Sequence, residues 1–404
     1  MLTLQQTWSS VMAHTPCLPA GEVAIAEALG CVLAEPILAD RDLPPADRSA
    51  KDGFAVRAAD LRNAPVTMPI TGEVAAGSPA QPPVAEGACA RIFTGANLPP
   101  GADTVVMIES TREAGPGRVT FTVGESAGAH ILRRGENARQ GSELVSAGCV
   151  LGAIHIGLAA SAGRTTLRAF RKPRVSLVTT GRELLDPGMP AGSHQERDCN
   201  GPMLAAALTA AGFLIADALH VSDDLDAITR TLRQSLATAD AVVLSGGVSA
   251  GAYDFVPAAV TAVGARTLVH GVAMKPGKPF LFALAREDRP IFGLPGNPLS
   301  AATCLHEFAL PALRRMSGWP EADCRPIVRA RLREAVASTA GWQHYVLAKL
   351  AWTSTGAEVT PVPSRSSADL VTGAHADGAI VVPGDAAGLD RGALVDFRPW
   401  RVWP

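Results

Sequence analysis

Two lysines and several glycines gather in three short turns of the sequence. The turns are SGGVSAGAYDF, KPGKPF and GLPGNP, at residues 245–255, 275–280 and 293–298. Glycine lets the backbone come close to a ligand and turn its N–H groups toward an anion. Lys275 and Lys278 add mobile positive charge, which suits a phosphate group. The pattern predicts a site for a phosphate or a similar oxyanion.

Carboxylates stand beside the same turns. Asp254 lies near the end of the first turn, and Glu183 follows a fourth turn that begins after Thr180. Carboxylates next to phosphate-binding lysines are typical of a magnesium-assisted phosphate or anhydride site. The alternative is that these are tight surface turns with charged side chains, and the occurrence of four such turns in one chain favours the site.

Short apolar runs precede the turns, and they predict that a strand leads into each turn. The predicted strands are 174–180, 213–221, 241–244, 267–274 and 290–293, and the predicted helices are 201–211, 225–237 and 299–316. This alternation predicts a parallel sheet covered on both faces. Ligands bind such sheets beyond the carboxyl ends of the strands, so we expect the four turns to converge on one pocket. Asp223 and Asp224 precede a predicted helix, where they would cap it, and a cap near this edge can also serve a site.

The remainder of the chain has a different composition. Helices are predicted at 3–13 and at 23–34, the second with a break at Gly30. Between Val66 and Leu144 the strands are short and Gly, Pro and Thr are frequent, which predicts a separate, mostly β domain. After Arg325 the chain is predicted to be β again, as a small barrel or sandwich.

Polar residues in the first part of the chain are weaker candidates. Asp47, Ser49 and Asp52 are crowded into one turn, where such side chains often bond the local backbone. Thr94 precedes a glycine and could contact an oxyanion through its hydroxyl group. Three charged residues could belong to a site or to a solvated salt-bridge surface, and both interpretations stay open; they are Arg133, Arg134 and Glu136.

The composition limits the function classes. The chain has 404 residues, 47% of them hydrophobic and 18% charged, with a net charge of −2. These values predict more than one domain with large cores and argue against a nucleic-acid or membrane-surface role. No apolar run is long enough to cross a bilayer, and the first residues lack the pattern of a signal peptide. Seven cysteines without a CxxC pair indicate neither a disulfide framework nor a zinc site, so we expect a reduced, cytoplasmic protein.

Several of these stretches occur together in a known family. The chain resembles the MoeA family of molybdopterin molybdotransferases, which includes the gephyrin E domain. The resemblance covers nearly the whole length and rests on seven stretches in the family's order. They are DRSAKDGFA (47–55), RIFTGANLPPGADTVV (91–106), RRGEN (133–137), TTGREL (179–184), SGGVSAGAYD (245–254), KPGKP (275–279) and LPGNPLS (294–300).

The resemblance implies a multidomain fold of α/β and β parts. The expected domains are a connecting domain (21–38 and 141–170), a mostly-β insertion domain (39–140), a three-layer α/β molybdopterin-binding domain (1–20 and 171–322) and a C-terminal β-barrel (323–404). The implied reaction inserts molybdate into adenylylated molybdopterin and releases AMP, with Mg²⁺ assisting. The implied partners are a second copy of the chain, with sites shared between subunits, a molybdopterin adenylyltransferase and molybdoenzyme maturation proteins.

The resemblance also assigns roles to residues. The implied catalytic residues are Asp52, Thr94, Glu183, Asp254, Lys275 and Lys278, and Glu183 and Asp254 are the implied magnesium ligands. The implied substrate-binding residues are Asp223, Ser245, Gly246, Gly247, Ser249, Gly277, Pro295, Gly296, Asn297, Pro298 and Ser367. The glycines are expected to hold a phosphate through their N–H groups, and the lysines to neutralise the pyrophosphate or molybdate.

This sequence departs from the family pattern in two places. Asn137 stands where the family usually has aspartate, and an amide cannot replace a carboxylate as a charged ligand or a base. Arg48 and Lys51 replace an asparagine and a methionine near Asp52, which adds positive charge. An alternative function therefore stays open here, that of a catalytically weakened paralogue acting as a molybdopterin-binding or scaffold protein.

Overall fold

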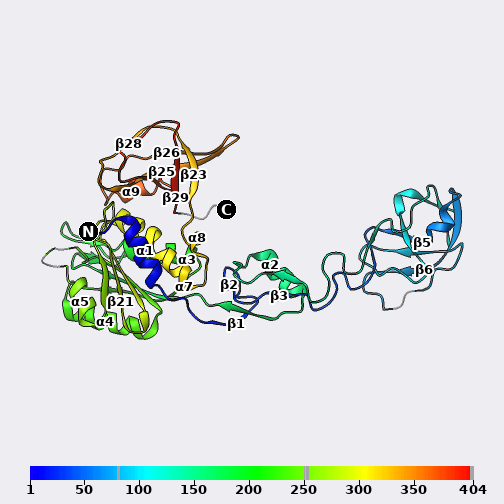
Figure 1. The fold of residues 1–404 in the computed structure, drawn as a ribbon, viewed down its shortest axis with the longest axis horizontal. Coiled ribbons are helices and arrows are strands. Elements are labelled where there is room, and N and C mark those ends of the chain that lie inside the picture. Colours follow the sequence, from blue (N-terminus) through cyan, green and yellow to red (C-terminus); the bar gives the residue numbers. More distant parts are fainter. Residues whose placement is uncertain (80–81, 250, 252–253, 401–404) are drawn as a thin grey trace. The chain divides into compact units, whose positions relative to one another are not determined.

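The structure is a computed structural model that describes residues 1–79, 82–249, 251 and 254–400. The chain forms two compact units (Figure 1). The first unit comprises Met1–Val23, Glu27–Ala34 and Leu167–Pro404, and the second comprises Ala24–Ala26 and Glu35–Thr166. Each unit is described by itself below. Within the described residues no helix is both long enough and apolar enough to span a membrane.

A six-stranded sheet forms the centre of the first unit. In spatial order its strands are β17 (Leu214–Val221), β14 (Arg174–Thr180), β18 (Ala241–Ser245), β22 (Pro290–Leu294), β21 (Leu281–Leu284) and β19 (Arg266–His270). The first four are parallel to one another, whereas β21 runs antiparallel to both of its neighbours. Four of the predicted strands are confirmed, but the sheet is mixed rather than wholly parallel. The strand predicted at 267–274 is confirmed only as far as His270, because Met274 and Lys275 form a separate strand, β20, outside this sheet. Strand β21 was not predicted, because it is fully buried and its short apolar run shows no alternation.

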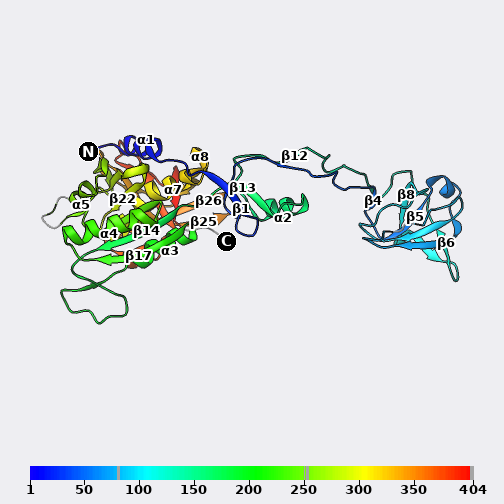
Figure 2. The same cartoon turned by 90° about the horizontal axis from the view of Figure 1, so that it is seen from below.

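Alternate residues of the central strands supply two cores, as the two-residue period of a strand requires. In β18, Ala241 and Val243 face one core, while Val242 and Leu244 face the other. Helices cover both faces, as predicted (Figure 2). Helices α4 (Leu225–Thr238) and α5 (Val256–Ala262) lie on one face, and α1 (Leu4–His14), α3 (Asn200–Ala210), α6 (Pro298–Cys304) and α7 (Leu310–Met316) lie on the other.

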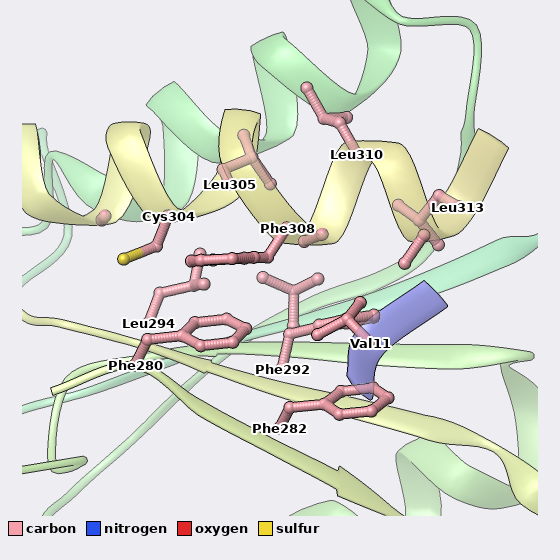
Figure 3. Packing of buried hydrophobic residues seen from close by; sticks show 14 of the residues in the cluster. Val11, Phe280, Phe282, Phe292, Leu294, Cys304, Leu305, Phe308, Leu310 and Leu313 are labelled. Carbon is pink, nitrogen blue, oxygen red and sulfur yellow. The ribbon is translucent and has the colours of Figure 1, made fainter. Parts of the chain in front are cut away.

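The face that carries α6 and α7 is rich in aromatic residues. Phe280 stacks on Phe308 with 4.4 Å between the ring centroids, and Phe282 stacks on Phe292 at 5.4 Å. Figure 3 shows these rings between the sheet and the helices, with Val11 of α1 beside them. A π-helical turn, Leu305–Ala309, joins α6 to α7. The predicted continuous helix at 299–316 therefore exists, with one locally widened turn.

The C-terminal strands close into a small barrel, as predicted. Its strands are β25 (Gln343–Thr353), β26 (Gly356–Pro361), β23 (Val328–Leu332), β29 (Leu394–Pro399) and β27 (Gly378–Val382), and closure results because β27 also pairs with β25. Shorter elements in this region are β24 (Val336–Ala337), β28 (Gly388–Leu389), α8 (Glu321–Cys324) and α9 (Leu370–Gly373). Strand β20 (Met274–Lys275), which precedes the KPGKPF turn, pairs in parallel with β25. This pairing joins the barrel to the lysine turn.

The helix predicted at 23–34 is wrong. That segment contributes β1 (Ala20–Ala24) and β2 (Val32–Leu33), which flank β13 (Thr166–Phe170) in a three-stranded sheet. Gly30 has a φ of +75°, a left-handed conformation that ends any helix there. Val32 and Leu33 are buried and pair with a strand more than 130 residues later, so tertiary pairing overrides the local helical tendency.

The second unit is mostly β, as predicted. Its six-stranded sheet has the order β8 (Thr104–Met107), β5 (Gly53–Val56), β7 (Cys89–Ile92), β6 (Val66–Val74), β10 (Arg118–Phe121) and β9 (Thr111–Glu113). Two short ribbons pair β4 (Arg48–Ser49) with β11 (Ile131–Leu132) and β3 (Ile37–Leu38) with β12 (Glu143–Val145). The unit also contains helix α2 (Ala153–Ser161).

Candidate active site

A pocket of about 1530 Å³ lies where the predicted turns leave the sheet of the first unit. The expectation that four turns converge is confirmed, because residues of all four line this one pocket. The predicted site residues in its lining are Glu183, Asp223, Ser245, Gly246, Gly247, Ser249, Asp254, Lys275, Gly277, Lys278, Pro295, Gly296, Asn297, Pro298 and Ser367. Residues 250, 252 and 253 of the first turn lie outside the described residues.

Two glycines of the pocket are required by geometry. Gly246 has a φ of +102°, and a Cβ atom there would lie 2.4 Å from the carbonyl oxygen of Thr180. Gly277 has a φ of +113°, and its Cβ atom would lie 2.7 Å from Sγ of Cys304. The predicted role of Gly246 needs correction, however, because its N–H donates to the carbonyl of Leu294 at 3.1 Å. That N–H is engaged within the protein, so Gly246 shapes the turn and does not bind an anion through its amide.

The two lysines of the KPGKPF turn are exposed at the pocket. Among the described residues, no carboxylate oxygen lies within salt-bridge distance of the ammonium group of Lys275 or Lys278. Within that part of the chain, neither charge is therefore neutralised by an ion pair. A ligand with phosphate or oxyanion groups would find two cations here.

Two carboxylates of the pocket, those of Asp254 and Asp223, are held by local donors. The Oδ2 atom of Asp254 accepts a hydrogen bond of 2.6 Å from the N–H of Gly251. Asp223 accepts from the Thr180 hydroxyl and from the N–H of Arg182, so it does not cap α4. Asp224 alone makes that cap, through the N–H of Ala227 at 2.8 Å. The predicted capping role is thus wrong for Asp223, whose carboxylate belongs to the pocket.

A metal site made by the protein alone is not present in the described part of the chain, where no three His, Cys, Asp or Glu residues are grouped suitably. Mg²⁺ does not need such a group. It commonly keeps several water molecules and binds one or two carboxylates together with oxygens of a phosphorylated substrate. Two carboxylates of this kind, Glu183 and Asp254, belong to the lining of the pocket.

Polar residues that the sequence analysis missed connect the turns. The amide of Asn200, which is almost fully buried, donates to the Ser245 hydroxyl at 2.9 Å and to the carbonyl of Gly296 at 2.6 Å. Thr179 donates to Asp198 at 2.7 Å. A sequence signal existed in the polar run Arg197–Asn200 just before a predicted helix, but nothing local showed which turns it would contact.

The C-terminal barrel and its loops supply part of the pocket lining. The Ser367 hydroxyl accepts a hydrogen bond of 2.8 Å from the side-chain amide of Asn297, which ties the barrel to the GLPGNP turn. Trp342 and His344 also line the pocket, and the sequence analysis missed both. Burial first, and then the charge of Lys275, lowers the pKa of the His344 imidazole. The barrel thus brings Ser367, an implied substrate-binding residue, to the pocket.

Asp52 and Thr94 belong to the second unit, where they contact each other. One oxygen of Asp52 accepts hydrogen bonds of 2.7 Å from both the N–H and the hydroxyl of Thr94. These two donors, the N–H first, lower the pKa of Asp52. The pairing presents a carboxylate beside a hydroxyl on an exposed turn.

The RRGEN motif is part of a surface salt-bridge network. Arg133 pairs with Asp47 at 2.8 Å and Arg134 pairs with Asp42 at 2.6 Å, and both guanidinium groups are mostly exposed. Asn137 is exposed as well. Of the two interpretations of this motif, the structure supports the solvated salt-bridge surface.

Comparison with known proteins agrees with this architecture. Three family models match in sequence order: the MoeA N-terminal region (domain I and II) over residues 2–163, a probable molybdopterin binding domain over 176–315, and the MoeA C-terminal region (domain IV) over 329–400. The described fold is also similar to a solved structure, the molybdopterin biosynthesis MoeA protein of Pyrococcus horikoshii. That match has a TM-score of 0.80 and 29% identity and covers 100% of both chains.

Relatives of similar length share about a third of their residues with this chain. A molybdopterin molybdenumtransferase of Staphylococcus aureus is 33% identical over 402 residues, which cover 98% of this chain and 95% of the relative. A molybdopterin molybdenumtransferase of Staphylococcus epidermidis is 32% identical, with coverage of 92% and 88%. With all three parts matched in order and the pocket built from the shared motifs, the chain belongs to the MoeA family of molybdenum cofactor biosynthesis proteins.

Proposed function

We propose that this protein is a molybdopterin molybdenumtransferase, which inserts molybdate into adenylylated molybdopterin and releases AMP. The relatives that bear this name span nearly the whole chain. The observation that carries the proposal is the pocket itself, where Lys275 and Lys278 lack carboxylate partners among the described residues and share one lining with Glu183 and Asp254. Two such cations beside carboxylates suit a phosphoanhydride together with an oxyanion such as molybdate.

The pocket residues divide into groups with separate roles. Lys275 and Lys278 would bind the pyrophosphate link and the molybdate, and Asp223 would contact the pterin part. Backbone amides of the remaining glycines would bind the terminal phosphate, while the prolines shape the wall where molybdate sits. The residues concerned are Gly247, Gly277, Gly296, Pro295 and Pro298, with Ser245, Ser249, Asn297 and Ser367 as further contacts.

Glu183 and Asp254 are the residues that we propose to hold Mg²⁺. The hydrogen bond from the N–H of Gly251 to Oδ2 orients the Asp254 carboxylate in the turn. Bound magnesium would neutralise negative charge on the phosphate oxygens during the reaction.

Release of AMP requires the oxygen of a water molecule to attack a phosphorus atom of the anhydride. One P–O bond forms and the bridging P–O bond breaks, while the proton of the water leaves with the phosphate products. The negative charge that develops on the departing phosphate would lie beside Lys275 and Lys278. Fixed cations aimed at developing charge are a large source of catalysis.

The test is AMP release from purified protein supplied with adenylylated molybdopterin, molybdate and Mg²⁺. We expect molybdate-dependent release in the wild type and a loss of about a hundredfold or more in Lys275→Ala and Lys278→Ala. Lys349→Ala is the matched control, since Lys349 is exposed on β25 and does not line the pocket. Absence of molybdate-dependent AMP release in the wild type would contradict the proposal. No observation in the structure favours the alternative of a weakened scaffold paralogue.

We further propose a homodimer with sites shared between subunits, to which Asp52 and Thr94 contribute from the second unit. Helix α2 supports an association surface, because it is apolar yet buries only Ala159, and Ile154 is 83% exposed.

A molybdopterin adenylyltransferase would supply the substrate, molybdoenzyme maturation proteins would receive the product, and the cytoplasm is the proposed location. The domain boundaries expected from the family resemblance remain part of this proposal.

A further inference from the structure

The barrel contacts one lysine of the pocket through an aromatic ring. The ammonium nitrogen of Lys278 lies 5.7 Å from the ring centroid of Trp342. At that distance a cation is attracted to the face of an indole ring. Lys278 is exposed at the pocket. The ring is thus its cation-binding partner within the described part of the protein.

The same segment of the barrel also flanks the other lysine. Strands β20 and β25 pair in parallel, with Lys275 opposite His344 in the register. Burial first, and then the charge of Lys275, lowers the pKa of the His344 imidazole. The Nδ1 atom of His344 lies 3.3 Å from the Ser338 hydroxyl oxygen. Trp342 immediately precedes this strand, so one stretch of three residues holds both the ring over Lys278 and the backbone partner of Lys275.

We propose that Trp342 is a positioning residue of the active site, whose indole ring holds the Lys278 ammonium group at the pocket. A lysine ammonium sits on a flexible four-carbon stem and loses rotamer freedom when it is fixed on an anion. A ring that restrains the stem beforehand reduces that cost when the ligand binds. The contact itself stands on the geometry, and only the nature of the oxyanion rests on the proposed function.

With this contact the barrel is part of the active site. Lys278 comes from a turn next to the α/β sheet, whereas the ring that contacts its ammonium group comes from the residue before strand β25. Removing the ring should therefore alter Lys278 without altering the fold of the sheet.

The contact can be tested by competitive acetylation of the intact protein. Brief labelling with acetic anhydride, quantified by mass spectrometry, reports how freely each lysine amine meets the reagent. In Trp342→Leu we expect Lys278 to be acetylated about two- to fivefold faster, because the ring no longer attracts and covers its ammonium group. Lys349 is the internal reference. Trp352→Leu is the matched control, since Trp352 is a 63% exposed tryptophan on the same strand.

The second readout is the kinetics of AMP release. We expect Trp342→Leu to raise the KM for adenylylated molybdopterin by roughly the same two- to fivefold factor, with a smaller change in kcat. Trp342→Phe should restore both the labelling rate and the KM, because phenylalanine keeps a ring face. A purely structural role for Trp342 predicts no such recovery.

The outcomes separate this inference from the proposed function. Unchanged Lys278 labelling in Trp342→Leu overturns the inference whatever the activity, and so does faster labelling with an unchanged KM. If the wild type releases no AMP, the proposed function fails, while the labelling and its recovery in Trp342→Phe still decide whether the ring holds the lysine.

Discussion

At the scale of single residues, the carboxylate of Asp254 is the clearest point at which to test the chemistry. Its Oδ2 atom is held by the N–H of Gly251, so Asp254→Asn keeps a hydrogen-bond acceptor in the turn and removes only the charge. We expect Asp254→Asn and Glu183→Gln to lower AMP release by about a hundredfold or more at fixed Mg²⁺. Circular dichroism should show an unchanged fold. Asp226→Asn, at an exposed position on α4, is the control.

The outcome that rejects the magnesium assignment is equally specific. If both variants release AMP at the wild-type rate and with the wild-type dependence on Mg²⁺, neither carboxylate holds the ion. If the loss is recovered at high Mg²⁺ concentration, the assignment is strengthened, because a weaker site fills at higher concentration of its ligand.

A second residue-scale prediction concerns His306, which stacks on Trp400 with 5.7 Å between the centroids. Burial first, and then the charge of Arg314, lowers the pKa of His306 to about 3. The unfolded chain has an ordinary histidine pKa of about 6.5, so between these values the unfolded state binds the extra proton. Neutral His306 therefore contributes fully to the free energy of unfolding above about pH 6.5. That contribution decreases as the pH falls toward 3, because protonation favours the unfolded state.

The measurement is chemical denaturation of wild type and His306→Gln at pH 7 and pH 4. Between those values we expect the free energy of unfolding of the wild type to fall by about 2–3 kcal/mol more than that of the variant. Equal losses in the two proteins would mean that the imidazole is not shielded from protonation in the native state. His14→Gln is the control, because His14 is exposed on α1.

At the scale of elements, the π-helical turn between α6 and α7 connects the α/β part to the barrel. Glu307 of this turn is 1% exposed, and it accepts from Arg398 of β29 at 2.8 Å and from Arg325 at 3.3 Å. Tyr345 of β25 lies beside the same carboxylate, and burial raises its pKa well above the usual value. A single buried carboxylate thus joins a helix to two barrel strands.

Removing that carboxylate should lower stability because the buried guanidinium group of Arg398 and the partly buried one of Arg325 would lose their counter-charge. We expect Glu307→Ala to lower the free energy of unfolding by about 3–5 kcal/mol, measured by urea denaturation. Glu321→Ala, at an exposed position on α8, should change it by less than about 0.5 kcal/mol. A Glu307→Ala protein as stable as the control would show that water replaces the lost partner.

At the scale of the whole molecule, the proposed shared site can be tested by mixing inactive subunits. Asp52→Ala and Asp254→Ala each remove a carboxylate, one from each unit of the chain. In a mixed dimer with shared sites, one site carries both lesions and the other carries none. Random exchange gives about half mixed dimers, so about a quarter of wild-type AMP release should return.

The mixing experiment needs proof that subunits exchange. Differently tagged chains and mass measurement of the dimers provide it, and a wild-type mixture processed in parallel shows that tagging itself is harmless. If mixed dimers form and no activity returns, each site is built within one chain. If the protein stays monomeric at all concentrations, the proposed homodimer is wrong.

Local patterns in the sequence predicted most of the sheet and the pocket. Central strands such as β14 and β18 are short apolar runs that end at turns containing glycine. Residues close together in the sequence therefore predict both that these segments are strands and where they end. Parallel strands then bring their carboxyl ends to one edge. Because of that rule, residues as distant along the chain as Glu183 and Gly296 could be expected in one pocket.

Local sequence patterns could not predict the contacts between segments that are distant along the chain. The segment at 23–34 forms strands because β13 pairs with it. The Gly246 amide is engaged because it donates to the carbonyl of Leu294. Asp223 belongs to the pocket because the Thr180 hydroxyl and the N–H of Arg182 donate to its carboxylate. The sequence by itself determined the elements and the charged turns, since these depend on residues a few positions apart. Only the tertiary structure decided which donors and cations remain available to a ligand, and that the barrel places Trp342 beside Lys278, since such pairings depend on how separate elements pack.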